Sequence, residues 1–345
     1  MLQQLARLTV RVPAASPRAC AIAVYTDDAD QIACAADRGY EGVACVDDAA
    51  RAAVLFCDVW ATTRLPYAAA RARSLSDFLF YMQDDEGRFV NFITNWDGVR
   101  NTDGPTSFAG GGFWQARGTR ALAKLWMVLG DERARERLLL ALPWIREATD
   151  VPADVRAIHA HMASELLRVG AMPQLRGDLE KWADELAACR KGAVLLDNPD
   201  ESTPHLWAHI QEGVLAEAGA LLDRPDLTAV ARQSALAYLA PLVESGFDAP
   251  SMDPYGAASA VYSLEKLEMV TGDAQFTELA AKARAWFDGR NPARRPVYDR
   301  RAGRVHDGID NGVLNRCSGA EANIVGAQAL LADVIAAAPM LLSAA

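Results

Sequence analysis

Residues 42–53 read GVACVDDAARAA, and they place two adjacent acidic residues, Asp47 and Asp48, at the start of an alanine-rich helix. A helix with so many small residues offers little polar surface to solvent, so we expect it to be buried on all sides. Far along the chain, residues 315–323 read NRCSGAEAN and again place an acidic residue, Glu321, in the first turn of a small-residue helix. We predict that the fold brings these two helix starts together.

The rest of the chain shows the apolar spacing of helices, with hardly any alternating run long enough to form a strand. Pro66 is typical of a helix start, and the Gly-Asp pairs at 130–131 and 272–273 each end one helix and cap the next. We predict twelve helices, at residues 27–37, 47–62, 66–82, 113–130, 132–147, 152–169, 174–190, 205–223, 226–243, 255–271, 274–289 and 318–338.

The connections between these helices indicate how they are arranged. Short connections follow the even-numbered helices, whereas most connections after odd-numbered helices are long. If the helices alternate in direction, the long loops gather at one end together with the N-termini of the even-numbered helices, where a rigid scaffold usually carries its site. Six hairpins predict an all-α (α/α)6 toroid, with the small-residue even helices inside and the charged odd helices outside.

We treat residues 1–345 as a single toroid domain in which residues 1–24 form an N-terminal extension. The competing architecture is an α-solenoid, but no repeat of the expected length recurs along the chain.

The composition argues against several classes of partner. A formal charge of −10 disfavours nucleic acid and anionic membranes, because a phosphate-binding face needs clustered basic residues. No apolar run approaches the length of a membrane span. The six cysteines show no CxxC spacing, and we predict no metal and no cofactor. We expect a cytoplasmic protein with a neutral or modestly charged small-molecule substrate.

Several motifs carry a resemblance to a known family. Residues 25–28 (YTDD), the run at 42–52 and residues 78–92 (FLFYMQDDEGRFVNF) resemble a group of bacterial six-hairpin glycosidase-like proteins, which occur alone or fused to glycosyltransferase domains. Residues 286–291 (WFDGRN) and 319–322 (GAEA) are similar to the same group. The resemblance implies an (α/α)6 toroid that acts on an oligosaccharide or polysaccharide. It also implies a glycosyltransferase or phosphorylase on the same glycan as a partner.

The acidic residues suit an inverting glycosidase. In such an enzyme one carboxylic acid protonates the leaving oxygen, and an opposite carboxylate deprotonates the attacking water. We predict that Glu321 is the acid and Asp48 the base, with Asp47 capping its helix. Structural roles remain open for all three residues. Both aspartates can simply satisfy the helix dipole, and Glu321 follows Ser318 at the spacing of a capping box.

Aromatic residues in the long loops and in the first turns of even helices are candidates for stacking on sugar rings. Trp96 and Trp114 are the stronger candidates because they belong to the longest early loop and the helix start that follows it. Four tryptophans inside predicted helices are assigned to the core instead, namely Trp126, Trp144, Trp182 and Trp286. The other predicted substrate contacts are Asp97, Arg117, His205, Trp207, Tyr255, His306 and Asp307.

Histidines support a second hypothesis, a sugar epimerase or isomerase. His205 and His209 stand four residues apart at the start of the predicted eighth helix, and His306 precedes the last even helix. Imidazole has a suitable pKa for moving a proton beside a carbonyl. Because no third ligand accompanies the His205 and His209 pair at a recognisable spacing, we do not expect zinc. A third hypothesis is a non-catalytic glycan-binding partner of a glycosyltransferase.

A local basic run interrupts this acidic chain between residues 290 and 304. Such a run is usually a solvated loop paired with its own acids. Less often it recognises a uronate or a sugar phosphate through bidentate hydrogen bonds. Both interpretations stay open for its six arginines, Arg290, Arg294, Arg295, Arg300, Arg301 and Arg304.

Overall fold

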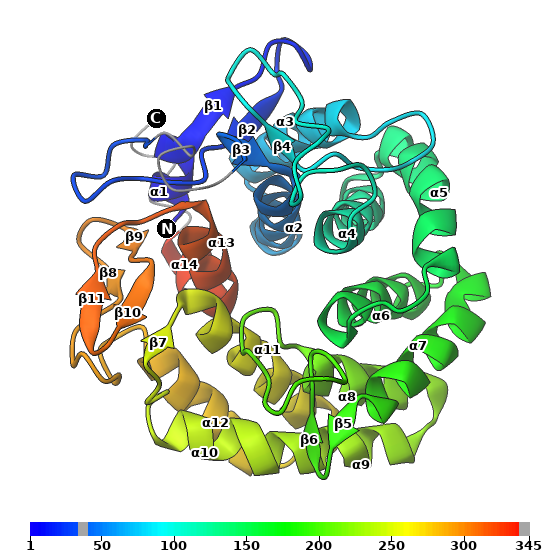
Figure 1. The fold of residues 1–345 in the computed structure, drawn as a ribbon, viewed down its shortest axis with the longest axis vertical. Helices are drawn as coiled ribbons and strands as arrows, with labels where there is room; N and C mark the ends of the chain where they lie inside the picture. Colours follow the sequence, from blue (N-terminus) through cyan, green and yellow to red (C-terminus); the bar gives the residue numbers. More distant parts are fainter. Residues whose placement is uncertain (34–40, 338–345) are drawn as a thin grey trace. The chain divides into compact units, whose positions relative to one another are not determined.

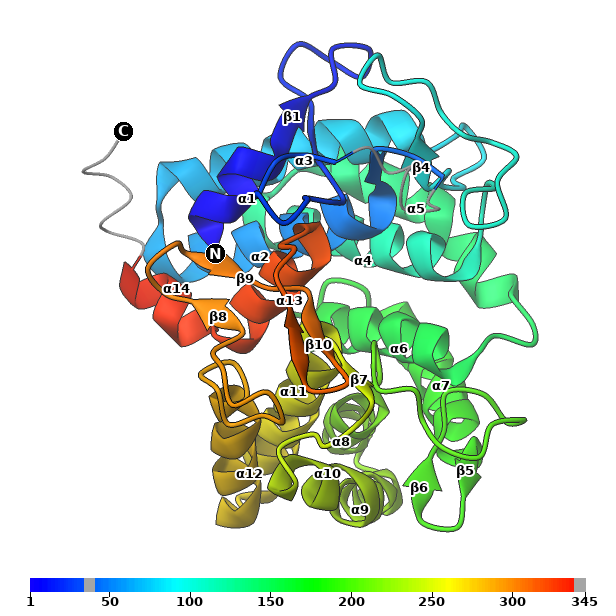
Figure 2. The same cartoon turned by 60° about the vertical axis from the view of Figure 1, so that its left-hand side comes forward.

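The computed structural model describes residues 1–33 and 41–337 (Figures 1 and 2). It divides into two compact units, and each is described by itself. The prediction of a single domain stays a prediction. Unit 1 comprises Met1–Ala148, Asp299–Asp307 and Arg316–Ala345, and unit 2 comprises Thr149–Tyr298 and Gly308–Asn315.

In unit 1, helix α2 (Val46–Thr63) is buried on most of its faces, as its alanines predict. It packs against α3 (Pro66–Met82), α4 (Gly112–Leu129) and α13 (Ala320–Ala329), and α13 lies beside α2 in both views of the ribbon (Figures 1 and 2). Small side chains allow this close approach, because they leave room for three neighbouring helices around one axis. The predicted meeting of the first and last small-residue helices is therefore confirmed within unit 1.

Helix boundaries in unit 1 follow the predicted signals. Pro66 opens α3, where its missing N–H costs nothing. Gly130 ends α4 with a left-handed φ of 63°, and the Asp131 side chain then accepts a hydrogen bond from the N–H of Arg133 to cap α5. The remaining elements of unit 1 are α1 (Leu2–Leu8), α5 (Glu132–Glu147), α14 (Leu331–Ala337), β1 (Thr9–Arg11), β2 (Cys20–Ile22), β3 (Ala44–Cys45), β4 (Phe92–Ile93) and β9 (Arg304–Val305).

The predicted helix at 27–37 is wrong over its described part, and residues 34–37 lie outside the described residues. The side chain of Asp27 accepts hydrogen bonds from the N–H groups of Ala29 and Gln31, which closes a turn instead of starting a helix. The predicted extension before it forms α1 and the antiparallel pair β1 and β2.

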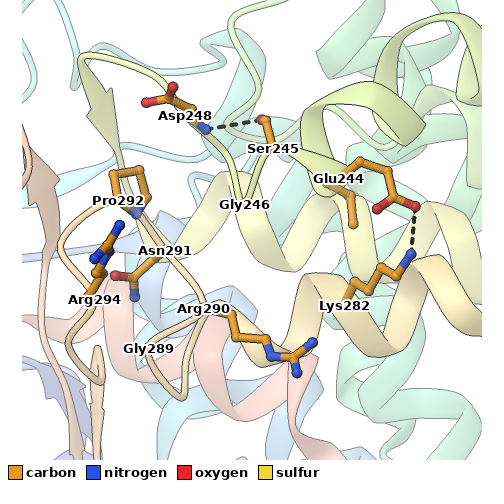
Figure 3. Close-up of a pocket in the computed structure, with 11 residues that line it drawn as sticks. Glu244, Ser245, Gly246, Asp248, Lys282, Gly289, Arg290, Asn291, Pro292 and Arg294 are labelled. Carbon is orange, nitrogen blue, oxygen red and sulfur yellow. Dashed lines mark hydrogen bonds and ion pairs between the residues drawn. The ribbon is translucent and has the colours of Figure 1, made fainter.

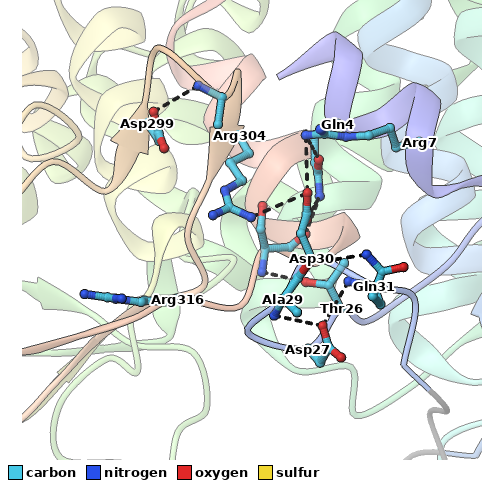
Figure 4. A network of polar contacts seen from close by, with 12 residues as sticks. Gln4, Arg7, Thr26, Asp27, Ala29, Asp30, Gln31, Asp299, Arg304 and Arg316 are labelled. Atoms are coloured by element: carbon cyan, nitrogen blue, oxygen red, sulfur yellow. Dashed lines mark hydrogen bonds and ion pairs between the residues drawn. The ribbon is translucent and has the colours of Figure 1, made fainter.

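The N-terminal helix and this turn are tied to the start of α13 (Figure 4). Gln4 of α1 donates hydrogen bonds to the Asp30 carboxylate at 2.5 Å and to the backbone oxygen of Ser318 at 3.2 Å. Arg304 forms an ion pair with Asp30 at 3.4 Å, and the Thr26 hydroxyl accepts from the N–H of Ser318 at 2.9 Å. The N-terminal segment therefore supports the helix that carries Glu321.

Unit 2 repeats the pattern of buried and outer helices. Helix α8 (Gln211–Leu222) packs against α6 (Ala153–Arg168) and α11 (Pro254–Thr271), and all three are buried on most faces. The outer helices α7 (Arg176–Ala188) and α9 (Pro225–Ser234) bury one face only. The other elements are a 3-10 turn (Pro173–Leu175), a π-helical turn (Ala235–Leu239), α10 (Ala240–Glu244), α12 (Ala274–Ala285), β5 (Arg190–Lys191), β6 (Val194–Leu195), β7 (Ser251–Met252), β10 (Gly308–Asp310) and β11 (Val313–Asn315). The short strand β8 (Tyr298–Asp299) has its first residue in unit 2 and its second in unit 1.

Two predicted helices are interrupted. The predicted ninth helix consists of α9, the π-helical turn and α10 in succession. The regular α-helical hydrogen bonding is broken there because Pro241 lacks an N–H and its ring crowds the carbonyl four residues earlier. The twelfth divides into α13 and α14, which are bent by 91°. Among the described residues no single helix is long and apolar enough to cross a membrane, and this bent pair alone meets the length and composition of a span.

Candidate functional site

The start of α2 is fixed by a short antiparallel pairing of β3 with β4. Cys45, the last residue of β3, is the N-cap of α2, and its Sγ accepts a hydrogen bond from the N–H of Asp48 at 3.4 Å. The prediction that Asp47 caps the helix is therefore wrong. Because the thiol takes the capping position, both aspartate side chains are available to bind arginines.

Arg51 joins two carboxylates, one three residues before it on α2 and the other 270 residues after it on α13. Its Nη2 donates to Oδ1 of Asp48 at 2.6 Å, and its Nη1 donates to Oε2 of Glu321 at 2.8 Å. Asp48 is only 2% exposed, whereas the Glu321 side chain is 48% exposed. Burial raises the pKa of the Asp48 carboxyl, and the charge of Arg51 opposes that rise.

Asp47 is held separately by residues of two other segments. Its Oδ1 accepts a hydrogen bond from Nη1 of Arg117 on α4 at 2.8 Å, and its Oδ2 accepts from the side-chain amide of Asn91 at 3.2 Å. The Arg117 guanidinium also lies over the ring of Phe113, 4.5 Å from its centre. The Asp47 side chain keeps 16% of its surface exposed, so solvent reaches it.

We call Asp47, Asp48, Arg51, Asn91, Arg117 and Glu321 the acid–arginine cluster. Asp48, the predicted base, is enclosed and bound by Arg51, so its carboxylate is not free to reach a water molecule in the solvent. Sequence reasoning gave no role to Arg51 or Asn91. Arg51 could have been found from its position three residues after Asp48, since such pairs meet on one helix face.

The start of α13 is held by the loop before it. Asp307 accepts a hydrogen bond from the N–H of Gly319, the N-cap residue, at 2.7 Å, so Asp307 supports the helix start. The capping-box alternative for Glu321 is wrong, because no side chain caps α13 and the Ser318 hydroxyl donates to the backbone oxygen of Val305. His306 is buried, and its burial lowers the pKa of the imidazole.

Several tryptophans of the two units differ from their predicted roles. Trp114 is 8% exposed, donates a hydrogen bond to the backbone oxygen of Phe108 at 2.9 Å and packs edge-on against that ring. Trp114 is therefore largely buried, and its role as a sugar contact stays a prediction. Trp96 is half-buried beside the exposed Asp97, and a substrate role for both stays a prediction. Trp144 was assigned to the core but is exposed, whereas Trp182 and Trp286 are fully buried and Trp126 is half-buried.

In unit 2, the segment before α8 carries the predicted histidines. Because α8 begins at Gln211, His205 and His209 do not share a helix face, and that prediction is wrong. Leu206 and Ala208 have φ values of 75° and 59°, a left-handed conformation that costs free energy for residues other than glycine. The exposed Trp207 lies between them. The chain thus holds a strained turn at this point, which is common at functional sites.

His205 lies between two buried carboxylates. Its Nε2 is 3.1 Å from Oδ2 of Asp154, its Nδ1 is 3.7 Å from Oδ2 of Asp197, and its ring stacks on Trp207 at 4.2 Å. The His205 side chain is 22% exposed. Burial lowers the pKa of this imidazole, but the two carboxylates outweigh that effect and raise it.

His209 is fully buried and anchors the segment. It contacts Asp197 at 2.7 Å and Glu212 at 3.1 Å. Burial opposes its charge, yet Glu212 and Asp197 raise the pKa of His209 to about 10. We call Asp154, Asp197, His205, His209 and Glu212 the histidine–carboxylate cluster. Sequence reasoning missed its three acids.

The histidine–carboxylate cluster contains a possible set of metal ligands. Asp154, Asp197 and His205 offer atoms within 4.8 Å of one another. Asp197, however, already accepts hydrogen bonds from the N–H of His205, from the His209 ring and from the Gln211 amide. Hydrogen bonding therefore accounts for the arrangement without a metal.

Tyr255, another predicted substrate contact, is half-buried in the first turn of α11.

Comparison with solved structures identifies proteins that have a similar fold. No protein-family model and no curated protein sequence matches the chain. Solved structures do match, at low identity. A sugar epimerase from a ruminal bacterium aligns with a TM-score of 0.73 and 12% identity over 97% of this chain and 95% of its own. Cellobiose 2-epimerase from Bacillus thermoamylovorans aligns with a TM-score of 0.72 and 12% identity over 96% of both chains.

A hydrolase is also similar. A family 76 glycoside hydrolase from a bovine Bacteroides thetaiotaomicron strain aligns with a TM-score of 0.65 and 10% identity over 96% of this chain and 76% of its own. All three are six-hairpin glycosidase-like proteins. At identities this low the likeness concerns the fold and not the reaction. The chain therefore has the all-α fold of the six-hairpin (α/α)6 toroid, glycosidase-like proteins.

Proposed function

We propose that this protein is a carbohydrate-active enzyme, an inverting glycoside hydrolase that cleaves an oligosaccharide or polysaccharide at the acid–arginine cluster. The proposal depends on one observation. Asp47 and Glu321 are the accessible carboxylates of the cluster, and a different arginine holds each of them, Arg117 and Arg51 respectively. Two separately positioned carboxyl groups are what acid–base cleavage of a glycosidic bond requires.

Glu321 is the proposed general acid. Arg51 contacts two carboxylates, Asp48 and Glu321, and so holds the Glu321 side chain at a fixed position beside the start of α2. Asp48 is enclosed, whereas Glu321 is half exposed and its second oxygen has no hydrogen-bond partner among the described residues. Glu321 is thus the carboxyl group that can reach a leaving oxygen.

Asp47 replaces Asp48 as the proposed base. Arg117 and Asn91 orient its carboxylate, and its partial exposure gives it access to a water molecule. Asp48 becomes a positioning residue that holds Arg51 from the buried side. In the reaction Glu321 gives its proton to the glycosidic oxygen as the bond to the anomeric carbon breaks. Asp47 removes a proton from the water that attacks the opposite face, which inverts the anomeric configuration.

The experiment follows hydrolysis of aryl glycosides and natural oligosaccharides by proton NMR, which identifies the anomer formed first. Glu321→Gln and Asp47→Asn should each lower turnover by about 10²–10⁴-fold. An aryl glycoside with a good leaving group should spare Glu321→Gln only, because that leaving group needs no proton. Asp58→Asn is the matched control, since Asp58 also lies on α2 and pairs with a cation, Lys124, at 2.8 Å. Wild-type turnover in both test variants would refute the assignment.

A sugar epimerase is the second candidate, and His205 favours it. Of the three histidines in that hypothesis, His209 is an enclosed ion-pair anchor and His306 is buried, so His205 is the imidazole that a sugar can reach. Its contact with Asp154 and its stacking on Trp207 orient it for proton transfer.

Deuterium exchange separates the two candidates. In D2O an epimerase exchanges the hydrogen on the carbon beside the sugar carbonyl, and NMR detects its loss without any hydrolysis product. If His205→Gln abolishes this exchange while Glu321→Gln keeps it, the epimerase proposal replaces the hydrolase proposal. If hydrolysis occurs without exchange, the epimerase proposal fails.

A further inference from the structure

The basic run at residues 290–304 contains both paired and unpaired arginines. Arg300 forms an ion pair with Asp333 at 2.9 Å, and Arg304 forms one with Asp30. The guanidinium groups of Arg290 and Arg294 have no hydrogen-bond or ion-pair partner among the described residues. In a chain with a formal charge of −10, two unpaired arginines close together in sequence are unusual enough to need an explanation.

Arg290 and Arg294 line the same pocket. This open pocket has a volume of about 610 Å³ and lies between the end of α10 and the loop that follows α12, entirely within unit 2 (Figure 3). Its volume falls in the range of small-molecule sites. The lining residues are Val243, Glu244, Ser245, Gly246, Asp248, Lys282, Gly289, Arg290, Asn291, Pro292 and Arg294.

The loop that carries both arginines is held in place. The buried Asn291 side chain donates hydrogen bonds to the backbone oxygens of Trp286 and Arg295, both at 2.8 Å. Gly289 has a φ of 103°, which favours glycine and lets the chain turn away from α12. Figure 3 shows the Arg290 and Arg294 side chains on different sides of Asn291. A loop fixed in this way loses little entropy when a ligand binds.

The charges that remain in the pocket favour an anion. Lys282 and Glu244 neutralise each other through an ion pair at 2.6 Å, which Figure 3 draws as a dashed line. That leaves Arg290, Arg294 and the exposed Asp248, whose carboxylate has no partner among the described residues. The balance is positive, and it comes from guanidinium groups, which bind carboxylate and phosphate in a bidentate manner.

We propose that this pocket binds an anionic saccharide, with its carboxylate or phosphate group on one of the two arginines, Arg290 or Arg294, and sugar hydroxyl groups within reach of the other. Asp248 accepts hydrogen bonds from the sugar hydroxyl groups. The pocket shares no residue with the acid–arginine cluster or with the histidine–carboxylate cluster. It is therefore an additional glycan site, and its existence does not depend on which reaction the protein catalyses.

Isothermal titration calorimetry tests the proposal with D-glucuronate, glucose 6-phosphate, inorganic phosphate and glucose. We expect one or both of the acidic sugars to bind, and glucose and inorganic phosphate to bind at least tenfold more weakly. Which acidic sugar binds more tightly tells a carboxylate site from a phosphate site. Arg290→Ala and Arg294→Ala should each weaken binding about tenfold or more, the usual loss for a hydrogen bond to a charged group.

Matched variants separate recognition from general charge. Arg295→Ala removes the same charge from the neighbouring exposed residue, which does not line the pocket, and should change affinity less than threefold. Arg290→Lys keeps the charge but not the bidentate fork, so it should also weaken binding. Glu321→Gln, which removes the proposed acid, should leave this binding unchanged. Three results would overturn the proposal. The first is equal affinity in wild type and in the Arg290→Ala/Arg294→Ala double variant. The others are inorganic phosphate binding as tightly as the acidic sugars, and no binding of either acidic sugar.

Discussion

Replacing Arg51 by methionine should destabilise the protein strongly and in a pH-dependent way. The substitution keeps a long apolar side chain but removes the hydrogen bonds to Asp48 and Glu321. The loss at Asp48 dominates, because this carboxylate is 2% exposed and would remain buried without its positive partner. Removing one member of a buried ion pair costs about 3–5 kcal/mol. The half-exposed Glu321 contact adds at most about 1 kcal/mol.

The pH dependence follows from the pKa of Asp48. Burial already raises this pKa above its ordinary value of 3.8, and Arg51 opposes the rise, so the variant should raise it further. A carboxyl group whose pKa is higher in the folded state costs no stability at a pH below 3.8, where it is protonated in both states. The cost grows as pH rises toward the folded pKa. Between pH 3.8 and the folded pKa, each unit of pH changes the cost by about 1.4 kcal/mol.

Urea denaturation followed by circular dichroism at pH 5 and pH 8 measures this effect. We expect Arg51→Met to lose about 3–5 kcal/mol of unfolding free energy at pH 8 and clearly less at pH 5. Adding Asp48→Asn should restore most of the loss, because no buried charge is left. Arg300→Met is the matched control, since Arg300 forms an ion pair with Asp333 in which both side chains are about half exposed, and it should cost less than about 1 kcal/mol. Equal losses at both pH values, or strictly additive losses in the double variant, would refute the reasoning.

Two further predictions concern the histidine–carboxylate cluster and the tryptophans. The ion pairs raise the pKa of His209 to about 10 in the folded protein, against an ordinary value of 6.5. The stability that the charged His209 contributes is therefore complete below pH 6.5 and is lost as pH rises toward 10. In thermal melts, the melting temperature of His209→Gln should fall less steeply between pH 6.5 and 10 than that of wild type, and an equally steep fall would contradict this. Trp114→Ala should lower unfolding free energy by about 3–5 kcal/mol because it empties a buried site, whereas Trp207→Ala should change stability by less than about 1 kcal/mol and weaken oligosaccharide binding by about 1–3 kcal/mol. Similar stability losses in both variants, measured by urea denaturation, would show that Trp207 belongs to the core.

Local sequence was enough to determine most helices of this protein. A proline at position 66 and the Gly-Asp pairs at 130–131 and 272–273 act within one or two turns, so their effect does not depend on the rest of the fold. The alanines of α2 likewise required burial wherever the helix lay. The turn at Asp27 was missed because its side chain bonds backbone N–H groups two and four residues on, and the same residue type also caps helices.

Which side chains work together was decided by tertiary structure. Asp47 and Asp48 are adjacent and chemically identical, and they differ only because Cys45 caps the helix, Arg117 arrives from α4 and Arg51 bridges to Glu321 across 270 residues. His205 acquires its raised pKa from Asp154 and Asp197, which reach it from other segments. Charge and burial depend on neighbours within a few ångströms, and most of these neighbours come from distant parts of the chain that the tertiary fold brings together. The sequence by itself therefore determined the helices and the acidic residues at their starts, whereas their partners and exposure were set by the fold.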